Sequence, residues 1–391
     1  MADTVRIRLS AVAVKTETTA GADAFGGSAP ALTDFIAAEM SFTLPQQTVE
    51  DPTLTGSFDR NAPIPTGIRP ELTLRIPLRG SGTPATAPEW GKLMQAARFE
   101  EVAQASAVGA PTAATAGTAN TATLATPFAA TAQAYRGMPI ILTGNPVGPR
   151  HSTVLDYTAG RVARVAETFS PILSTATLAQ IPVNFLYRLT DDETLIRPVT
   201  IYGYMGGLRH RFVGCVGSVS IEAAAGQPGY LNFSMRGQLL GAYEAAALPT
   251  GWNSIVRPQS PIWANGISRL DGVLARVANY GWNANNALYD PENPEAPQGY
   301  DRPEITAASH SVTLNPFTST TTSPTRFGKF QVGSSVSFAG MLGSVPGNRI
   351  AFTHPSLRVS TFEQGNRGDM SVDQLTLTPD VPGQGTFISV Y

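Results

Sequence analysis

ELTLRIPL, the stretch from residue 71 to residue 78, gives the clearest indication of how this chain folds. Every second residue from Leu72 to Leu78 is apolar, and the residues between them are Thr73, Arg75 and Pro77. A period of two is typical of a strand in an antiparallel sheet that has one buried face and one solvated face. The same alternation recurs at 216–223, 231–236, 357–362 and 374–378. The sequence therefore predicts a mainly β protein.

The composition of the 391 residues agrees with this prediction and narrows the function. The 37 glycines and 31 prolines indicate many turns between short strands, and 42% hydrophobic residues are enough for a packed core. Charged residues make up only 14%, against about 25% in an average domain, so we expect other chains to cover much of the surface. A net charge of −2 argues against a sequence-reading nucleic-acid binder, which needs a concentrated basic face.

One helix is well indicated, shortly after the stretch 71–78. Residues 86–89, Thr-Ala-Pro-Glu, form a predicted capping box with a proline in the first turn. Trp90, Leu93, Met94 and Ala97 follow with the spacing of an apolar stripe on a helix. We therefore expect a short helix that packs this stripe against a sheet.

Three other segments lack a clear period of two. From residue 102 to 134 the composition is reduced to Ala and Thr with occasional Gly and Pro, which predicts a long surface loop. We expect it to belong to an insertion in the first domain over about 102–160. The proline-rich segment 290–297 interrupts the second half of the chain similarly. The segment 270–278 fits a helix or a strand equally well.

Short blocks of sequence occur twice, in the same order and with similar spacing. This predicts an internal duplication with a boundary at 248–261, where proline and polar residues cluster. We expect a first domain at 1–250 and a second domain at 251–391. The blocks are DP at 51–52 and 290–291, RPELT at 69–73 and RPEIT at 302–306, and WGKL at 90–93 and FGKF at 327–330.

No residue pattern points to catalysis, a cofactor or a metal. His151, His210, His310 and His354 are scattered without the spacing of metal ligands. Cys215 is the only cysteine, which excludes an intramolecular disulfide and a thiolate zinc cage. A nucleophile elbow, a phosphate-binding glycine loop and a dinucleotide fingerprint are all missing. We expect a protein that is not an enzyme and needs no cofactor or metal.

Neither a membrane span nor a secretion signal is indicated. No run approaches 18 consecutive apolar residues. Residues 1–10 alternate apolar residues with Arg6 and Arg8, which predicts a strand and differs from the apolar block of a signal peptide. We therefore expect the protein to be made in a cytoplasm.

Three groups of motifs in the N-terminal half carry a family resemblance. They are KTETT at 15–19 with Gly21 and Asp23, LRGSGT at 78–83 with the tryptophan helix, and a hairpin pattern over 200–233. Together they resemble the tail tube proteins of long-tailed, non-contractile bacteriophages and prophages, over about 5–100 and 180–245. The Ala/Thr-rich insertion and Arg98-Phe99, where the family more often has Gly-Phe, depart from the pattern. The motif residues are Arg79, Gly80, Ser81, Gly82, Trp90, Gly91, Gly217 and Gly226.

The resemblance implies two tail-tube-type β-sandwich domains, each with a flanking helix. Sheets of neighbouring subunits would join into a ring with an inner β-barrel, and rings would stack into the tail tube of the virion. The tube would be assembled in the host cytoplasm and would conduct double-stranded DNA during ejection. We expect polar, uncharged or acidic side chains in the lumen, because each Lys or Arg contact would add friction. The implied partners are further copies of the chain, the tail terminator, the tail tip or distal tail protein, and the tape measure protein, without a membrane.

The predicted duplication bears on the symmetry of the ring. Two tube domains per chain give a trimer with pseudo-sixfold symmetry, whereas a second half outside the tube gives a hexamer; we favour the trimer. By analogy with the family, the loop 46–67 and its counterpart 290–300 reach the adjacent ring, although a surface loop without contacts is an alternative. The candidate residues are Gln46, Asp51, Thr53, Phe58, Arg60, Pro63, Pro65, Tyr289, Asp290 and Tyr300.

Two other functions stay open at this point. The chain fits a capsid, head–tail or distal tail component that forms a ring without stacking. It also fits a carbohydrate-binding β-sandwich, a receptor module that would need clustered exposed aromatic side chains. Trp252, Trp263 and Trp282 lie near the predicted domain junction, and we favour an interface there over a sugar-binding platform.

Overall fold

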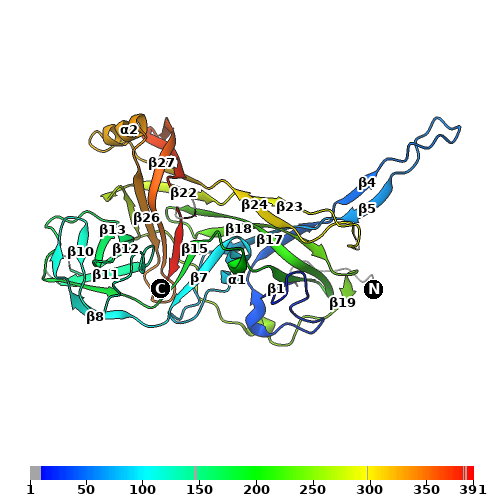
Figure 1. Ribbon diagram of the computed structural model, residues 1–391, viewed down its shortest axis with the longest axis horizontal. Coiled ribbons are helices and arrows are strands. Elements are labelled where there is room, and N and C mark those ends of the chain that lie inside the picture. Colours follow the sequence, from blue (N-terminus) through cyan, green and yellow to red (C-terminus); the bar gives the residue numbers. More distant parts are fainter. Residues whose placement is uncertain (1–9, 145–147, 297, 382, 384) are drawn as a thin grey trace.

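Antiparallel strands make up most of the protein, and helices are few and short (Figure 1). A computed structural model describes residues 10–144, 148–296, 298–381, 383 and 385–391. The strand predicted at 1–10 lies outside the described residues, apart from Ser10, which opens β1 (Ser10–Thr16). The prediction of a mainly β fold is confirmed.

One antiparallel sheet of eight strands crosses the whole molecule and contains the five alternating stretches of the sequence. Its spatial order is β3, β6, β18, β17, β22, β25, β28, β27. Leu74 of β6 lies between Met40 of β3 and Phe233 of β18, so core-facing side chains pack side by side. The bounds are β3 (Glu39–Thr43), β6 (Glu71–Pro77), β18 (Tyr230–Leu239), β17 (Leu208–Ala224), β22 (Val277–Asn283), β25 (Ser311–Pro316), β28 (Met370–Pro379) and β27 (Ile350–Arg367).

Two long strands, β17 and β27, each belong to two layers. Register shifts between Val213 and Val216 and between Val359 and Thr361 bend them. Their N-terminal parts thereby join a second layer, as in a β-sandwich. Its order is β2, β1, β16, β17, β19 in one half and β21, β20, β26, β27, β29 in the other. The bounds are β2 (Phe35–Ile36), β16 (Val199–Met205), β19 (Glu244–Ala245), β20 (Ile267–Leu270), β21 (Val273–Leu274), β26 (Val336–Leu342) and β29 (Phe387–Val390).

The pairings of the N-terminal half, residues 10–245, recur in the C-terminal half, residues 267–390. Strands β1, β2, β3, β6, β16, β17, β18 and β19 correspond in this order to β20, β21, β22, β25, β26, β27, β28 and β29. Corresponding pairs in β3–β6 and β22–β25 differ by 240 in residue number, so Met40 faces Leu74 as Tyr280 faces Leu314. The segment 270–278, which fitted helix or strand, forms part of β20, β21 and β22.

The two helices occupy corresponding places, after β6 and after β25. They are α1 (Gly91–Ala96) and α2 (Ser323–Val332). The WGKL block begins at Trp90, the N-cap of α1, and the FGKF block lies within α2. The RPE blocks, in contrast, lie on different elements, β6 and β24 (Glu304–Ala308). The predicted apolar stripe of α1 is fully buried. The predicted capping box is wrong, because the carboxylate of Glu89 binds the guanidinium groups of Arg79 and Arg257 instead. The described residues also contain three short 3-10 helices: Leu32–Asp34, Glu193–Leu195 and Trp252–Ser254.

The Ala/Thr-rich insertion is folded, so the prediction of a long loop is wrong. β7 (Phe99–Gln104) pairs with β15 (Asn184–Leu189), and a seven-stranded antiparallel sheet lies between them in the sequence. Small alanines such as Ala122 and Ala179 pack with Phe128, Tyr135 and Tyr157 in a separate core. The strands are β8 (Val108–Ala113), β9 (Ala116–Gly117), β10 (Thr121–Thr123), β11 (Pro139–Gly144), β12 (Arg150–Tyr157), β13 (Val162–Val165) and β14 (Thr177–Ile181).

Each half also carries a two-stranded arm between corresponding strands. The first arm is formed by β4 (Gln46–Val49) and β5 (Ile64–Ile68), the second by β23 (Asn286–Tyr289) and β24. Figure 1 shows the first arm projecting from one end of the molecule, whereas the second arm lies along its body. The strands of the two arms have the same spacing in the sequence, because β23 and β24 each begin 240 residues after β4 and β5. Their surroundings differ.

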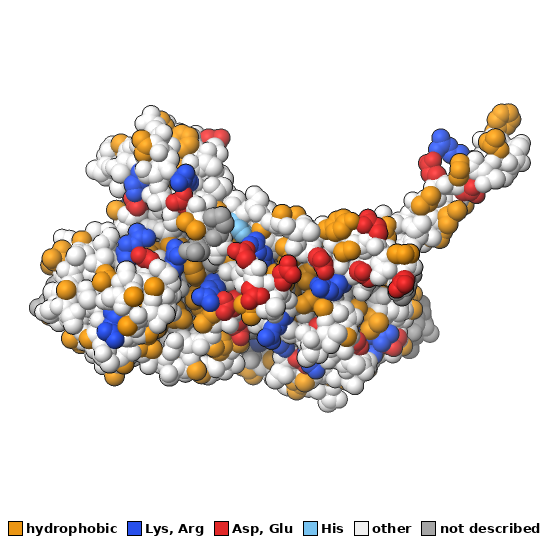
Figure 2. All heavy atoms as spheres, viewed as in Figure 1, with side chains coloured by type: hydrophobic (Ala, Val, Ile, Leu, Met, Phe, Trp, Pro, Cys, Tyr) orange, Lys and Arg blue, Asp and Glu red, His pale blue; other side chains and the backbone are white. Residues whose placement is uncertain are grey.

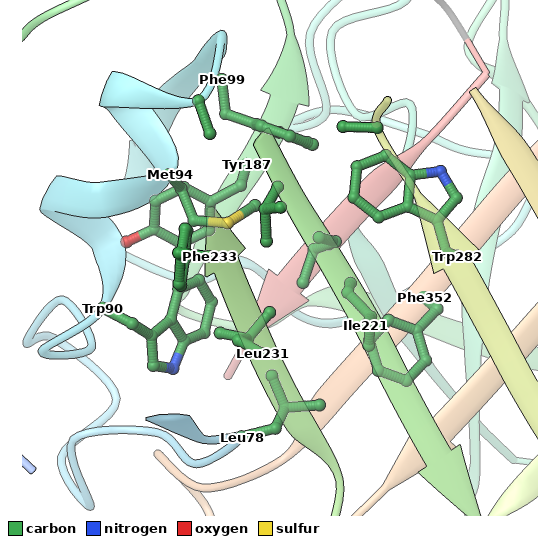
Figure 3. Close-up of a cluster of buried hydrophobic side chains, with 14 of the residues drawn as sticks. Leu78, Trp90, Met94, Phe99, Tyr187, Ile221, Leu231, Phe233, Trp282 and Phe352 are labelled. Atoms are coloured by element: carbon green, nitrogen blue, oxygen red, sulfur yellow. The ribbon is translucent and has the colours of Figure 1, made fainter. Parts of the chain in front are cut away.

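The main core lies between the two layers and continues through both halves. Trp90, Tyr187 and Ile221 of the N-terminal half are fully buried in the same cluster as Trp282 and Phe352 of the C-terminal half (Figure 3). Burying large side chains of this kind contributes roughly 2–3 kcal/mol each to stability. The halves are therefore held together by apolar packing as well as by strand pairing.

Candidate channel and assembly surface

The face of the eight-stranded sheet that points away from the core carries mainly small polar side chains. These residues alternate along each strand with buried apolar residues such as Leu72, Phe233 and Leu375. The surface is hollowed over β22, β25, β27 and β28. The polar residues include Ser41, Thr43, Thr73, Ser218, Ser220, Asn232, Ser234, Asn279, Asn283, Thr313, Asn315, Thr361, Gln374 and Thr376.

Charges on this face are balanced, and three of its arginines are paired with carboxylates, including Arg358 with Asp380. Arg75 lies 3.6 Å from Glu39 and stacks on the ring of Tyr230 at 3.8 Å. Arg236 lies 3.0 Å from Glu71 and 3.4 Å from Asp290. Figure 2 shows acidic and basic side chains interspersed on the visible face of the molecule, without a large basic patch. The charged side chains of the strand face are Glu39, Glu71, Glu222, Glu363, Arg75, Arg236, Arg358 and Arg367.

The two halves meet where β22 pairs with the C-terminal part of β17, a contact that we name the internal joint. Ser220–Ala224 face Asn279–Asn283 there, and Trp282 packs against Phe99 with ring centroids 5.7 Å apart. Immediately beyond β22, the side-chain amide of Asn286 donates to the carbonyl oxygens of Ala97 at 3.1 Å and Gly217 at 2.9 Å. The joint therefore combines backbone pairing, aromatic packing and buried amide contacts.

The first group of motif residues lies where the strand–turn–helix of the N-terminal half meets the C-terminal half. The backbone N–H of Gly80 donates to Asn348 Oδ1 at 2.8 Å, and a Cβ at Gly80 would overlap the carbonyl oxygen of Gly347. Arg79 donates to Glu89 at 2.6 Å and its carbonyl oxygen accepts from Trp90 Nε1 at 2.8 Å. Only a residue without a side chain allows this close approach of two backbones.

The remaining motif residues serve packing and turns. A Cβ at Gly91 would overlap the hydroxyl of the buried Tyr187, and one at Gly217 would overlap the carbonyl oxygen of Ser234. Gly226 has a positive φ of 75° and donates to the carbonyl oxygen of Trp263 at 2.9 Å. Ser81 and Gly82 lie in the turn between β6 and α1, where Gly82 donates to Gly347.

The predicted inter-ring residues lie on the two arms, which differ in how far they contact the rest of the chain. On the first arm, Gln46 lies on β4 and Pro65 on β5, and the remaining candidates lie in the tip, residues 50–63. The tip exposes Leu54 and Phe58 completely. Its candidates are Asp51, Thr53, Phe58, Arg60 and Pro63.

On the second arm, contacts with the N-terminal half occupy two of the three candidates. Asp290 lies 3.4 Å from both Arg69 and Arg236, and the Tyr300 ring lies 3.7 Å from the Arg69 guanidinium. Tyr289 is half exposed and donates to Glu292 at 2.6 Å. The second arm is thus bound to the N-terminal half, whereas the first extends into solvent.

The histidines and the cysteine do not form a common site. Burial lowers the pKa of His354 to about 4 and that of His310 to about 4. Burial also raises the pKa of the Cys215 thiol. Among the described residues, no group of three or more His, Cys, Asp or Glu side chains is placed to hold a metal. None of the helices in the described ranges has the length and apolar character to span a membrane.

The tryptophans lie inside the molecule. Trp90, Trp263 and Trp282 are buried, and Trp252 packs against a cluster that contains Tyr202. Trp263 packs edge to face against Tyr280, with ring centroids 6.3 Å apart. The aromatic side chains near the junction thus contribute to contacts within the chain.

A comparison with protein families identifies the chain. The family described as phage tail tube protein matches residues 8–378, which is nearly the whole sequence and includes both halves. The chain belongs to this family. As a tail tube protein it is a structural component of the phage virion that assembles with itself and with other tail components. A search of curated proteins found no match.

Sequence reasoning missed the pairing of β17 with β22 and the identity of the sheet edges. The alternation did predict that each of these strands has a polar face, since each polar residue lies between two apolar ones. The pairing partners, in contrast, are about 60 residues apart in β17 and β22, and no local pattern connects them. Only the tertiary structure brings these strands together.

Proposed function

We propose that three copies of this tail tube protein close into a ring with pseudo-sixfold symmetry. The observation that carries the proposal is the eight-stranded sheet, in which four strands of each half follow the same order. We take the two halves as duplicated tube domains, residues 1–250 and 251–391, so that three chains supply six equivalent units. The family match across both halves supports a C-terminal half that belongs to the tube.

The sheet has the features of one segment of a closed barrel. Within the described residues, β3 pairs only with β6, and the part of β27 beyond Leu357 pairs only with β28. Unpaired edges invite association, and head-to-tail contacts between identical copies close into rings when the rotation allows it. Eight strands from each of three copies give a barrel of twenty-four strands. Barrels of about 16–18 strands already leave an aqueous channel, so this one would be wider.

The polar face of the sheet would line the channel for DNA during ejection. Small hydroxyl and amide side chains offer no fixed positive charge to the phosphates. Arg75 and Arg236 are already paired with Glu39 and Glu71, which reduces their attraction for DNA. DNA would therefore pass along the wall without strong binding.

Stacking of such rings would extend the channel into a tube. The first arm supports this step, because its tip projects from the body and exposes Leu54 and Phe58. We propose residues 50–63 for contacts with an adjacent ring. The tube would form in the host cytoplasm, around the tape measure protein and between the tail terminator and the tail tip or distal tail protein. In this proposal the protein is structural and catalyses no reaction.

Imaging purified recombinant protein by negative-stain electron microscopy tests the proposal. We expect stacked hollow rings whose end-on averages have threefold symmetry. Six identical densities per ring would contradict the trimer and favour a hexamer with the C-terminal half outside. Single rings that never stack would favour another head–tail or distal tail component. A protein that stays monomeric even with purified tail tip complex would contradict the proposed function.

A further inference from the structure

We propose that the ring closes when β3 of one copy adds to the free edge of β27 in the next copy, in the register that β22 takes on β17. We name this contact the ring joint. The inference rests on the proposed function, and it specifies the two strand edges that meet when the ring closes. The partner is a second copy of the same chain. The internal joint serves as the template, because its two strands have counterparts with open edges.

In the internal joint, β17 exchanges one neighbour for another along the same side. β16 pairs with β17 from Leu208 to Cys215, and β22 takes this side at Ser220–Ala224. β18 stays on the opposite side across the change. The strand is thus shared between the second layer and the eight-stranded sheet.

In the C-terminal half, β27 undergoes the same change but its second neighbour is missing. β26 pairs with β27 from Ile350 to Leu357, and β28 occupies the opposite side from Leu357 to Arg367. Among the described residues, no strand takes the β26 side of β27 beyond Leu357. Glu363, Gln364 and Asn366 are exposed there. The open edge is the counterpart of the segment of β17 that binds β22.

The strand that corresponds to β22 is β3, and it also has one open side. β3 pairs only with β6 in the described part of the chain, as β22 does with β25 apart from the internal joint. Figure 1 shows β27 and the arm that continues from β3 toward opposite ends of the long axis. The two edges of one copy therefore cannot meet each other and are placed for head-to-tail contact.

The corresponding pairings fix the register of the ring joint. Ser220 faces Asn283 in the internal joint, and the equivalent residues are Glu363 and Thr43. At the other end Ala224 faces Asn279, and the equivalent residues are Arg367 and Glu39. This register places the opposite charges of Arg367 and Glu39 on facing positions. Opposite charges on facing strand positions stabilise pairing.

An open apolar cleft beside β27 supports a partner at this edge. The cleft has a volume of about 870 Å³, and Phe317, Phe327, Phe362 and Met370 line it. Gln364, which also lines it, would face Phe42 of the next copy in the derived register. In the internal joint the counterpart of Phe42 is Trp282, which is fully buried. The ring joint would thus cover part of an apolar surface that is exposed in a single chain.

The first arm would follow β3 onto the next copy. Gln46 lies 240 residues before Asn286, whose side-chain amide binds Ala97 and Gly217 just past the internal joint. The base of the arm therefore contacts the neighbour within the ring, and residues 50–63 lie beyond this contact. Gln46 would therefore contact a neighbour inside the ring and not the adjacent ring.

Cysteine cross-linking tests the register. The double variant Thr43→Cys/Glu363→Cys places thiols at facing positions, and both native residues are exposed on the polar face. The matched control, Thr43→Cys/Thr361→Cys, uses the same face but shifts one thiol by two residues, beyond disulfide reach. The native Cys215 is buried and should not react. Rings would be assembled under reducing conditions, verified by electron microscopy, oxidised with diamide and analysed by non-reducing electrophoresis.

We expect covalent dimers and trimers from the first variant, in at least about tenfold excess over the control. Rings in which the shifted pair cross-links better would overturn the derived register. Rings that cross-link with neither pair would overturn the ring joint while leaving the proposed ring in place. Failure of the unmodified chain to form rings would instead contradict the proposed function.

Discussion

The two halves of the molecule have the same strand order but different surroundings. In the N-terminal half, α1 is covered by β15, and Trp90, Leu93 and Met94 are fully buried. In the C-terminal half no strands are inserted after α2, and Phe327 is 42% exposed. The helix is thus covered by neighbouring strands in the N-terminal half and partly exposed in the C-terminal half. A surface that is exposed only in the second half is the place to look for a partner copy.

The difference also explains why the chain combines a stable body with open edges. The C-terminal half closes the N-terminal half through β22, β29 and the second arm. Nothing within the described chain closes the C-terminal half in the same way at β27. Assembly can then supply the missing contacts without unfolding either half. Four predictions test this view, from the largest expected effect to the smallest.

Truncation of the aromatic side chains at the two joints should affect different properties. Trp282→Ala should lower the free energy of unfolding by about 3–5 kcal/mol, because the ring is fully buried. Phe42→Ala, at the corresponding position of β3, should cost only about 1 kcal/mol because this side chain is half-buried. Urea unfolding followed by circular dichroism checks both values.

The same pair of variants separates stability from assembly. Phe42→Ala should reduce the fraction of protein in rings, measured by sedimentation velocity, more than its small loss of stability explains. An equal loss of stability in both variants would contradict the difference between the two edges, because it would show that Phe42 and Trp282 are equally important in the single chain.

Acid should weaken the protein through the C-terminal half. His354 is fully buried, and burial lowers its pKa to about 4. Its Nδ1–H donates to the carbonyl oxygen of Gly385 at 2.9 Å, so Nε2 of the neutral ring accepts from the Tyr280 hydroxyl at 2.9 Å. The unfolded chain binds a proton near pH 6.5, so unfolding becomes easier as the pH falls from about 6.5 to about 4. This histidine alone should remove about 3 kcal/mol over that range.

Comparison with a His354→Gln variant isolates this contribution from the carboxylates. The free energy of unfolding of the variant should depend less steeply on pH between about 4 and 6.5. Parallel pH profiles for the two proteins would mean that the pKa of His354 is not lowered in the folded protein.

Alanine at the corresponding helix glycines should act in opposite directions. A Cβ at Gly91 would overlap the hydroxyl of Tyr187, so Gly91→Ala should destabilise the protein by about 1–3 kcal/mol. A Cβ at Gly328 meets no atom within 4 Å, so Gly328→Ala should stabilise α2 by about 0.5–1 kcal/mol. Thermal unfolding at a concentration that keeps the protein monomeric gives both signs. The same sign for both would indicate that α2 is as tightly covered as α1.

Reversal of the charges at the end of the ring joint should have the smallest effect. Glu39→Arg and Arg367→Glu should each weaken ring formation by about 0.2–1 kcal/mol per joint. The double variant should recover most of the loss, since the charges are again opposite. Dissociation of rings on dilution, followed by light scattering, measures the difference. If the losses of the two single variants instead add in the double variant, Glu39 and Arg367 do not face each other in the ring.

The sequence by itself determined the strands and their faces. Alternation at 71–78 and at four other stretches predicted strands that the structure contains, and the spacing from Trp90 to Ala97 predicted the buried side of α1. It did not predict the sheet between β7 and β15, because Ala and Thr differ too little in polarity to show a period. The capping box failed for a related reason: the sequence shows that Glu89 can cap a helix but not that Arg257 lies beside it.

Only the tertiary structure decided which edges are closed and which stay open. β17 meets β22, the polar side chains of eight strands gather on one surface, and the second arm binds Arg69 and Arg236. A strand has the same local pattern whether its edge is paired or free, because alternation records which side chains are buried and not where the backbone N–H and C=O groups bond. The partners of an edge are set by segments far away in the chain, and for β27 we propose a segment of another copy.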